Sequence, residues 1–294
     1  MTFFDKCLQF LFSGLTTGSI YALIAIGFGV VHNASGIMNL VQCEFVTLGG
    51  MIAVTYYMSL GIPLAISVLL AIITVTVLGA VFERSTIRTA RSQQLVVLIF
   101  ITIGASFFIR GLILVVWGSD PFALPPFSGE EPFHILGATV LPQYIWVFGI
   151  TILVVIALHF FFKRTVIGKA MRAASGNKRA AALVGISVNR VVLYSFAMSG
   201  AVGAIAGIIV APITGTSYDI GFIIGLKGFS AAVLGGYGSM PGAVLGGLVL
   251  GVVESLTAGL ISSAYKNVLA FVILLLVLFF MPSGLLGERE MERV

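Results

Sequence analysis

The chain has 294 residues, of which 59% are hydrophobic and 9% charged, and its mean hydropathy is +1.13. A soluble domain has about 25% charged residues, so this composition excludes a globular protein with a water-covered surface. The long apolar runs also exclude a transmembrane barrel, whose strands read as short alternating segments.

Nine apolar segments approach or exceed the length of about 20 residues with which a helix crosses a bilayer. We therefore predict an all-α fold, a polytopic transmembrane helical bundle of about 8–9 spans with Gly-broken or re-entrant segments. The first segment lacks a basic n-region, so we expect a retained helix rather than a signal peptide. The seventh is short and contains Lys227, and we interpret it as a half-helix or a helix lying against water. The segments are 7–31, 44–60, 62–82, 95–117, 143–162, 191–212, 220–235, 241–262 and 267–282.

Polar residues interrupt the apolar pattern in "GIMNLVQCEFVTLGG" (36–50), which contains Asn39, Gln42 and Glu44. In hydrocarbon an unsatisfied polar side chain costs several kcal/mol, so these residues must face protein or water. We predict that 33–45 is a non-helical or re-entrant stretch that lines a cavity. Glu44 would then lie near the start of the following helix, where the helix dipole favours a carboxylate. The alternative is that Asn39 and Glu44 cap helices and hold the bundle together.

Two further polar positions lie inside apolar segments. Tyr21 belongs to a stripe of small and hydroxyl residues in the first segment, which is typical of helix packing and equally of a translocation wall. Glu254, in "GVVESLTAG", is a second acidic residue at membrane depth. The candidate translocation path therefore comprises Tyr21, Asn39, Gln42, Glu44 and Glu254.

Lys and Arg residues in short loops predict the orientation of the chain in the membrane. The loop 83–94 is basic, and the loop 163–190 contains seven basic residues and no acidic one, so both are predicted to be cytoplasmic. The segment 118–142 has Asp and Glu but no Lys or Arg and is predicted to be outside. Counting crossings places the tail 287–294 in the cytoplasm and the N-terminus outside. Because the basic residues follow loops in this way, the net charge of +5 does not indicate a nucleic-acid partner.

The loop 163–190 contains a short helical pattern, "KRAAALV", which Gly185 would end at a C′ position. Such a helix is too short to be stable alone, so it is predicted to dock, either onto this protein or into a groove of another. An anionic membrane surface is the alternative partner for its positive charges.

Motifs of enzyme chemistry are missing from the sequence. It has no P-loop, no H-E-x-x-H motif and no nucleophile–base pair. We therefore predict that the chain is not an enzyme and holds no cofactor or metal itself.

The two glycine-interrupted segments 36–50 and 235–247 each precede an apolar helix. Paired interruptions are typical of an inverted repeat with a path near the midplane. A chain with 35 glycines also shows such pairs without a repeat, and both interpretations stay open. Since no polar stretch is long enough for a soluble domain, we predict one transmembrane domain, 1–294, which includes the loop 163–190.

Three longer segments together resemble the membrane permease of bacterial branched-chain amino acid ABC importers. They are "GLTTGSIYALIAIGFGVVHNASGIMNLVQCEF", "GKAMRAASGNKRAAALVGISVNRV" and "GFSAAVLGGYGSMPGAVLGGLVLGVVE", and the later "MPSGLLG" (281–287) fits as well. The resemblance implies a second permease subunit, two cytoplasmic ATP-binding-cassette ATPases that bind ATP, and an external or periplasmic substrate-binding protein. It also implies a multi-pass place in the bacterial inner membrane and the helical fold of related sugar permeases.

The resemblance also assigns a role to the cytoplasmic loop. "RAAALVG" (179–185) is similar to the E-A-A-x-x-x-G pattern with which ABC importers dock their ATPases. Ala180, Ala181 and Gly185 match it, whereas Arg179 stands in place of the glutamate. The expected ATPase-docking residues are Lys178, Arg179, Ala180, Ala181, Ala182, Leu183, Val184 and Gly185.

The polar segment before the second apolar run fits the family as well. Asn39, Glu44 and Phe45 match an N-x-x-x-G-E-F-like run of the permeases. Cys43 replaces the glycine of that run, so the backbone flexibility there is expected to differ.

These observations predict the permease subunit of an ATP-binding-cassette importer that works by alternating access on branched-chain amino acids. Urea, short amides and other neutral amino acids are alternative substrates. A stand-alone transporter coupled to protons or sodium, with Glu44 or Glu254 as the coupling carboxylate, is the alternative mechanism. The second permease could be a distinct chain or another copy, and the resemblance favours a distinct one.

Overall fold

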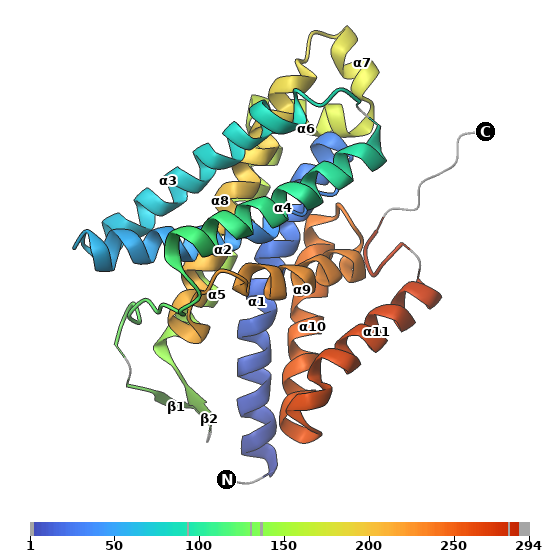
Figure 1. Ribbon diagram of the computed structural model, residues 1–294. Coiled ribbons are helices and arrows are strands. Elements are labelled where there is room, and N and C mark those ends of the chain that lie inside the picture. The colour runs from blue at the N-terminus through green and yellow to red at the C-terminus, as the bar shows by residue number, and fades with distance from the viewer. Residues whose placement is uncertain (1–2, 93, 130, 136–137, 282, 288–294) are drawn as a thin grey trace. The chain divides into compact units, whose positions relative to one another are not determined.

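The computed structural model describes residues 3–92, 94–129, 131–135, 138–281 and 283–287 (Figure 1). Its elements are α1 (Phe3–Ser35), α2 (Gln42–Val54), η1 (Thr55–Ser59), α3 (Leu64–Phe82), η2 (Glu83–Ile87), α4 (Leu95–Trp117), β1 (Phe133–Ile135), β2 (Ala138–Val140), α5 (Pro142–Arg164), α6 (Val166–Gly176), α7 (Lys178–Leu183), α8 (Val188–Thr214), α9 (Ile220–Gly235), α10 (Met240–Leu260), η3 (Ser263–Tyr265) and α11 (Lys266–Phe280). Residues 288–294 of the predicted cytoplasmic tail, Glu130 of the predicted outer segment and Pro282 of "MPSGLLG" lie outside the described residues.

Each of the nine predicted apolar segments corresponds to a helix, which confirms the polytopic helical membrane fold. Within the described residues, six helices are long and apolar enough to cross a membrane. The other three apolar segments form the shorter helices α2, α9 and α11. The six long segments are Asp5–Ser35, Leu64–Ile87, Leu95–Trp117, Pro142–Arg164, Val188–Thr214 and Met240–Leu260.

The chain divides into two compact units, which we describe separately. The first unit comprises Met1–Gly29, Pro125–Thr151 and Leu226–Val294, and the second comprises Val30–Leu124 and Ile152–Gly225. Helices α1, α5 and α9 each contribute residues to both units. The single domain 1–294 and the inverted repeat stay predictions.

In the second unit, α2 and α3 both pack along α8. Glycines of α8 make this close approach feasible because they place no side chain between the helices. A Cβ atom built at Gly200 would lie 2.7 Å from the carbonyl oxygen of Val75 in α3. One built at Gly203 would lie 2.8 Å from the Cβ atom of Phe45 in α2. The glycines therefore hold α2, with its polar first turn, against the centre of this unit.

The break before α2 is shorter than predicted. Gly36, with φ of +72°, ends α1, and α2 begins at Gln42. The non-helical stretch is therefore 36–41 rather than 33–45, because residues 33–35 complete α1 and residues 42–45 already belong to α2. As predicted, Glu44 lies in the first turn of the following helix.

In the first unit, α1 packs against α10 through glycines on both helices. A Cβ atom built at Gly14 would lie 2.7 Å from the Cα atom of Val252, and one at Gly18 would lie 2.8 Å from the carbonyl oxygen of Gly247. At this contact, the small residues of α1 serve helix packing. A two-stranded antiparallel hairpin, β1–β2, belongs to the same unit and lies in the predicted outer segment.

Candidate functional site

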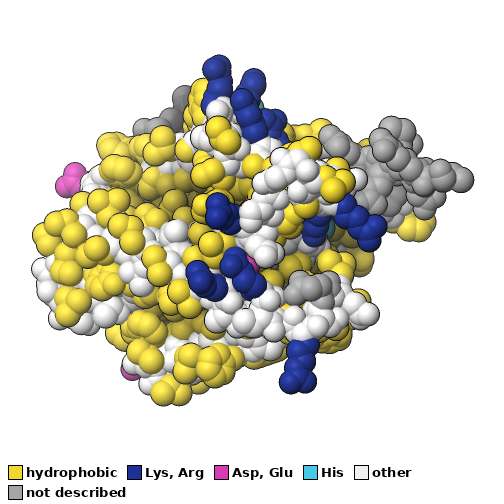
Figure 2. All heavy atoms as spheres, turned by 90° about the horizontal axis from the view of Figure 1, so that it is seen from above, with side chains coloured by type: hydrophobic (Ala, Val, Ile, Leu, Met, Phe, Trp, Pro, Cys, Tyr) yellow, Lys and Arg dark blue, Asp and Glu magenta, His cyan; other side chains and the backbone are white. Residues whose placement is uncertain are grey.

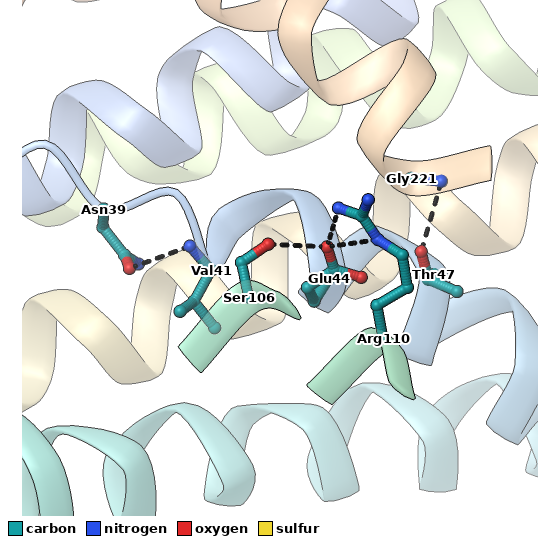
Figure 3. Close-up of polar contacts among 7 residues, drawn as sticks. All are labelled: Asn39, Val41, Glu44, Thr47, Ser106, Arg110 and Gly221. Atoms are coloured by element: carbon teal, nitrogen blue, oxygen red, sulfur yellow. Dashed lines mark hydrogen bonds and ion pairs between the residues drawn. The ribbon is translucent and has the colours of Figure 1, made fainter. Parts of the chain in front are cut away.

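An ion pair lies in the interior of the second unit, between α2 and α4. Nη2 of Arg110 lies 2.6 Å from Oε1 of Glu44, and its Nε lies 3.2 Å from the same oxygen (Figure 3). The Ser106 hydroxyl donates to this oxygen at 2.8 Å. Glu44 is fully buried, and the Arg110 side chain is 15% exposed. Below, these residues together with Asn39 and Gln42 are called the α2 polar cluster.

Aromatic rings also accommodate the charge of Arg110. Its guanidinium carbon lies 3.9 Å from the ring centre of Phe222 and 5.5 Å from that of Phe107. A desolvated cation–π contact contributes about 2 kcal/mol. Arg110 is not among the site residues predicted from the sequence, although an ionisable residue inside an apolar span is itself a signal of a paired or functional group.

Three side chains of the α2 polar cluster retain unused hydrogen-bonding atoms. Asn39 accepts a bond from the backbone N–H of Val41 at 3.2 Å, and Gln42 accepts one from the Ser199 hydroxyl. Asn39 Nδ2, Gln42 Nε2 and Glu44 Oε2 have no hydrogen-bond partner among the described residues, and all three residues are fully buried. An unmatched buried polar atom costs about 1–3 kcal/mol. The cluster is thus suited to receive a polar group.

A second ion pair lies in the first unit. Nζ of Lys227 lies 2.5 Å from one carboxylate oxygen of Glu254, and the Tyr21 hydroxyl donates to the other at 2.8 Å. The Lys227 side chain is only 12% exposed, and whether the helix 220–235 lies against water stays a prediction. The carboxylate of Glu254 neutralises the lysine, which explains how a charge is tolerated there. The helix itself is short, as expected.

The five candidate path residues therefore fall into two groups. Tyr21 and Glu254 meet in the first unit, whereas Asn39, Gln42 and Glu44 follow one another in the second. An apolar groove of about 410 Å³ in the second unit lies between α2, α3 and α4, and none of the five candidates lines it. A hydrophobic groove of this kind does not explain the polar residues, and their place in a translocation path stays a prediction.

The loop 163–190, which is predicted to be cytoplasmic, forms α6 and α7, and α7 has a defined start and end. Asn177 caps it, because its Oδ1 accepts a bond from the backbone N–H of Ala180 at 3.0 Å. Gly185, with φ of +87°, follows the helix at the predicted C′ position. Ala181 is buried, whereas Leu183 and Val184 are 88% and 77% exposed. The helix is therefore anchored by a small residue and presents two large apolar side chains outward.

Positive charge surrounds this helix. All Lys and Arg residues of the loops 83–94 and 163–190 are exposed. Figure 2 shows the molecule of Figure 1 from above. Lys and Arg side chains gather on the face seen there, with few acidic side chains among them. A partner that binds here needs an apolar recess and acidic or neutral surroundings.

Comparisons with known proteins agree with this architecture. Residues 10–278 match the family described as "Branched-chain amino acid transport system / permease component". The chain is 36% identical to the high-affinity branched-chain amino acid transport system permease protein LivH of Escherichia coli, over 98% of this chain and 97% of that one. It is 35% identical to the permease protein BraD of Pseudomonas aeruginosa, over 98% of each. The structure of PsaBC from Streptococcus pneumoniae in complex with Fab has a similar fold, with a TM-score of 0.52 and 14% identity over 93% of this chain and 92% of that one.

Proposed function

We propose that this chain, which belongs to the family of branched-chain amino acid transport system permease components, forms the translocation path of an ATP-driven importer for branched-chain amino acids. The multi-pass helical fold supports the permease role. The observation that carries the ATP-driven part is α7, a capped cytoplasmic helix with exposed Leu183 and Val184. Large apolar side chains on a water-facing helix are typical of a docking surface.

The partners follow from this assignment. The chain has no P-loop of its own, so ATP is bound by two cytoplasmic ATPases, one of which receives α7. A second permease subunit completes the membrane core, and an external binding protein delivers the substrate. The complex lies in the bacterial inner membrane.

The α2 polar cluster fits an amino acid in chemical terms. A free amino acid at neutral pH carries a carboxylate and an ammonium group. The amide N–H groups of Asn39 and Gln42 suit the carboxylate, and the second oxygen of Glu44 suits the ammonium. We propose that these atoms contact the substrate when the path opens. The cluster contacts only the part shared by all amino acids, so the choice among leucine, isoleucine, valine and other neutral substrates belongs to the binding protein.

The ion pairs favour this mechanism over coupling to an ion gradient. A coupling carboxylate must exchange its proton or cation during each cycle. Glu44 and Glu254 each contact a basic side chain within 2.6 Å. Both carboxylates are thus already occupied by a basic side chain, so a source of energy outside the chain is the simpler explanation.

Co-purification tests the proposal. The chain carries a C-terminal affinity tag, is expressed in its native membrane with its neighbouring genes intact, and is solubilised gently. We expect mass spectrometry to recover a P-loop ATPase and a second permease with it. A known ABC importer treated in parallel controls for losses in detergent.

Transport then tests the substrate. The recovered complex is reconstituted in vesicles with ATP inside and the binding protein outside, and uptake of radiolabelled leucine, isoleucine, valine and urea is compared. We expect uptake of the three amino acids and none without ATP. Uptake by the purified chain alone under a proton or sodium gradient would contradict the proposal. Uptake of urea alone would contradict the substrate assignment and leave the importer assignment standing.

A further inference from the structure

Lys178, the first residue of α7, contacts the end of a different helix. Its Nζ donates a hydrogen bond to the carbonyl oxygen of Ser35, the last residue of α1. A Cβ atom built at Gly36 would lie 3.8 Å from the same nitrogen, so the lysine lies against the turn at which α1 ends. All three residues belong to the second unit.

Helix electrostatics explain why this lysine extends toward α1. The N-terminus of a helix carries partial positive charge, and α7 has no acidic residue in its first turn to offset a lysine there. The last carbonyl groups of a helix lack partners within the helix and carry partial negative charge. The contact therefore places the ammonium near the partial negative charge at the end of α1 and away from the partial positive charge at the start of α7. Partial burial there lowers the pKa of Lys178.

The end of α1 leads directly to the α2 polar cluster. Between the two helices, the Thr102 hydroxyl of α4 donates to the carbonyl oxygen of Met38 at 3.1 Å and accepts from the backbone N–H of Leu40 at 3.4 Å. The segment is thus held in place along its length. One end of it receives the lysine, and the other leads into the turn of α2 that carries Glu44.

We propose that Lys178 is a positioning residue that links α7 to the break between α1 and α2, so that displacement of α7 by an ATPase moves the segment before Glu44. The inference rests on the proposed function, because it takes α7 as the docking helix. It adds a specific route, the bond between an ammonium and a carbonyl group. Because α7 also packs against α6 and α8, its place does not depend on this bond alone. The resemblance includes Lys178 among the docking residues, but its ammonium is bonded to Ser35, so we assign Lys178 to transmission and docking to the exposed Leu183 and Val184.

The test uses the complete complex in vesicles, with its ATPases and binding protein. Lys178→Met keeps an unbranched side chain of nearly the same length but cannot donate a hydrogen bond, and Lys178→Arg restores a donor. Lys169→Met is the matched control, because it removes the same charge from an exposed position of α6. Three quantities are measured for each variant: the ATPase that co-purifies, the ATP hydrolysed and the leucine taken up.

We expect Lys178→Met to retain its ATPase and to hydrolyse ATP while leucine uptake per ATP falls about tenfold. Lys178→Arg and Lys169→Met should transport like the unaltered complex. Unchanged uptake per ATP in Lys178→Met would overturn the inference. Loss of the co-purifying ATPase in that variant would also overturn it, since Lys178 would then serve docking itself.

Chemical restoration of the ammonium provides a second test. In a Cys7→Ser background, the thiolate of Lys178→Cys displaces bromide from 2-bromoethylamine, which forms a carbon–sulfur bond and yields a lysine-like side chain. Cys43 is fully buried and should not react. We expect the modification to restore uptake per ATP, and failure to restore it would contradict a role for the ammonium. If the unaltered chain binds no ATPase at all, the proposed function fails, which is a different result.

Discussion

Glu44 and Arg110 come from helices far apart in the sequence and meet at 2.6 Å in the interior of the second unit. Either charge alone would be costly at membrane depth. Together the two charges neutralise each other, and the Ser106 hydroxyl donates a further hydrogen bond to the carboxylate. The pair thus allows a polar cluster to persist inside an apolar protein.

Breaking this pair should destabilise the second unit strongly. Removal of one partner of a buried ion pair costs about 3–5 kcal/mol, because the other charge is left without compensation. We expect Glu44→Gln and Arg110→Gln each to lower the melting temperature of the purified chain in detergent. The double variant should recover part of the loss, since neither charge then remains. If the losses of the single variants simply add in the double variant, the two side chains do not interact energetically.

Two glycines offer a matched pair with opposite predicted effects. A Cβ atom at Gly203 would lie 2.8 Å from that of Phe45, so Gly203→Ala should cost about 1–3 kcal/mol through overpacking. Gly104 lies in α4 with open space around it, so Gly104→Ala should stabilise the helix by about 0.5–1 kcal/mol. Thermal unfolding of the two variants checks the signs. Equal shifts would contradict the close contact between α2 and α8.

The sequence was sufficient for features that depend on neighbouring residues. Each span is a local run of apolar side chains, and each of the nine segments predicted from hydropathy is a helix in the part of the chain that the structure describes. Gly185 ends α7 as predicted, because the need for positive φ is also local. The position of Glu44 in the first turn of α2 followed from the same kind of evidence.

Contacts between distant residues could not be predicted from this one sequence. Lys227 led to two interpretations of its helix, a half-helix or a helix lying against water, because its partner Glu254 lies on another helix. Arg110 was overlooked for a related reason, since only the fold brings it to Glu44. The bond from Lys178 to the end of α1 likewise joins segments more than a hundred residues apart. Which charged side chains form pairs depends on how the helices pack, and the hydropathy of the sequence does not show this.

The candidate path can be tested by replacing one side-chain atom, Nδ2 of Asn39, which has no hydrogen-bond partner among the described residues. Asn39→Asp keeps the oxygen that accepts from Val41 but replaces the N–H donors with an acceptor. If these donors meet the carboxylate of the substrate, uptake should fall by at least about tenfold, because the new oxygen repels that group. Thr151→Val is the control, since Thr151 is also buried with an unpartnered hydroxyl but lies outside the path. Normal uptake by Asn39→Asp in an assembled complex would remove Asn39 from the path.

The cap of α7 should matter for ATPase binding. Loss of an N-cap side chain costs about 0.5–2 kcal/mol, and a helix of one or two turns has little stability to lose. We expect Asn177→Ala to weaken ATPase binding, whereas Asn177→Asp should preserve it because the carboxylate oxygen still accepts from Ala180. Titration of the purified ATPase onto the permease in nanodiscs measures both affinities. Equal weakening by the two variants would point to a contact of the amide nitrogen rather than to capping.

The outward side chains of α7 provide the most direct test of docking. Leu183 and Val184 are largely exposed, and burial of such side chains stabilises a complex by about 1.5–3 kcal/mol each. Replacement of both by serine should therefore weaken ATPase binding more than about 100-fold in the same titration, while the melting temperature stays unchanged. Val166→Ser is the matched control, because Val166 is 83% exposed at the start of α6 but lies outside the predicted docking residues. If Val166→Ser weakens binding as much as the double variant, α6 shares the docking surface. If neither change affects binding, the ATPase does not use this helix, and the apolar residues of α7 must contact lipid or another partner.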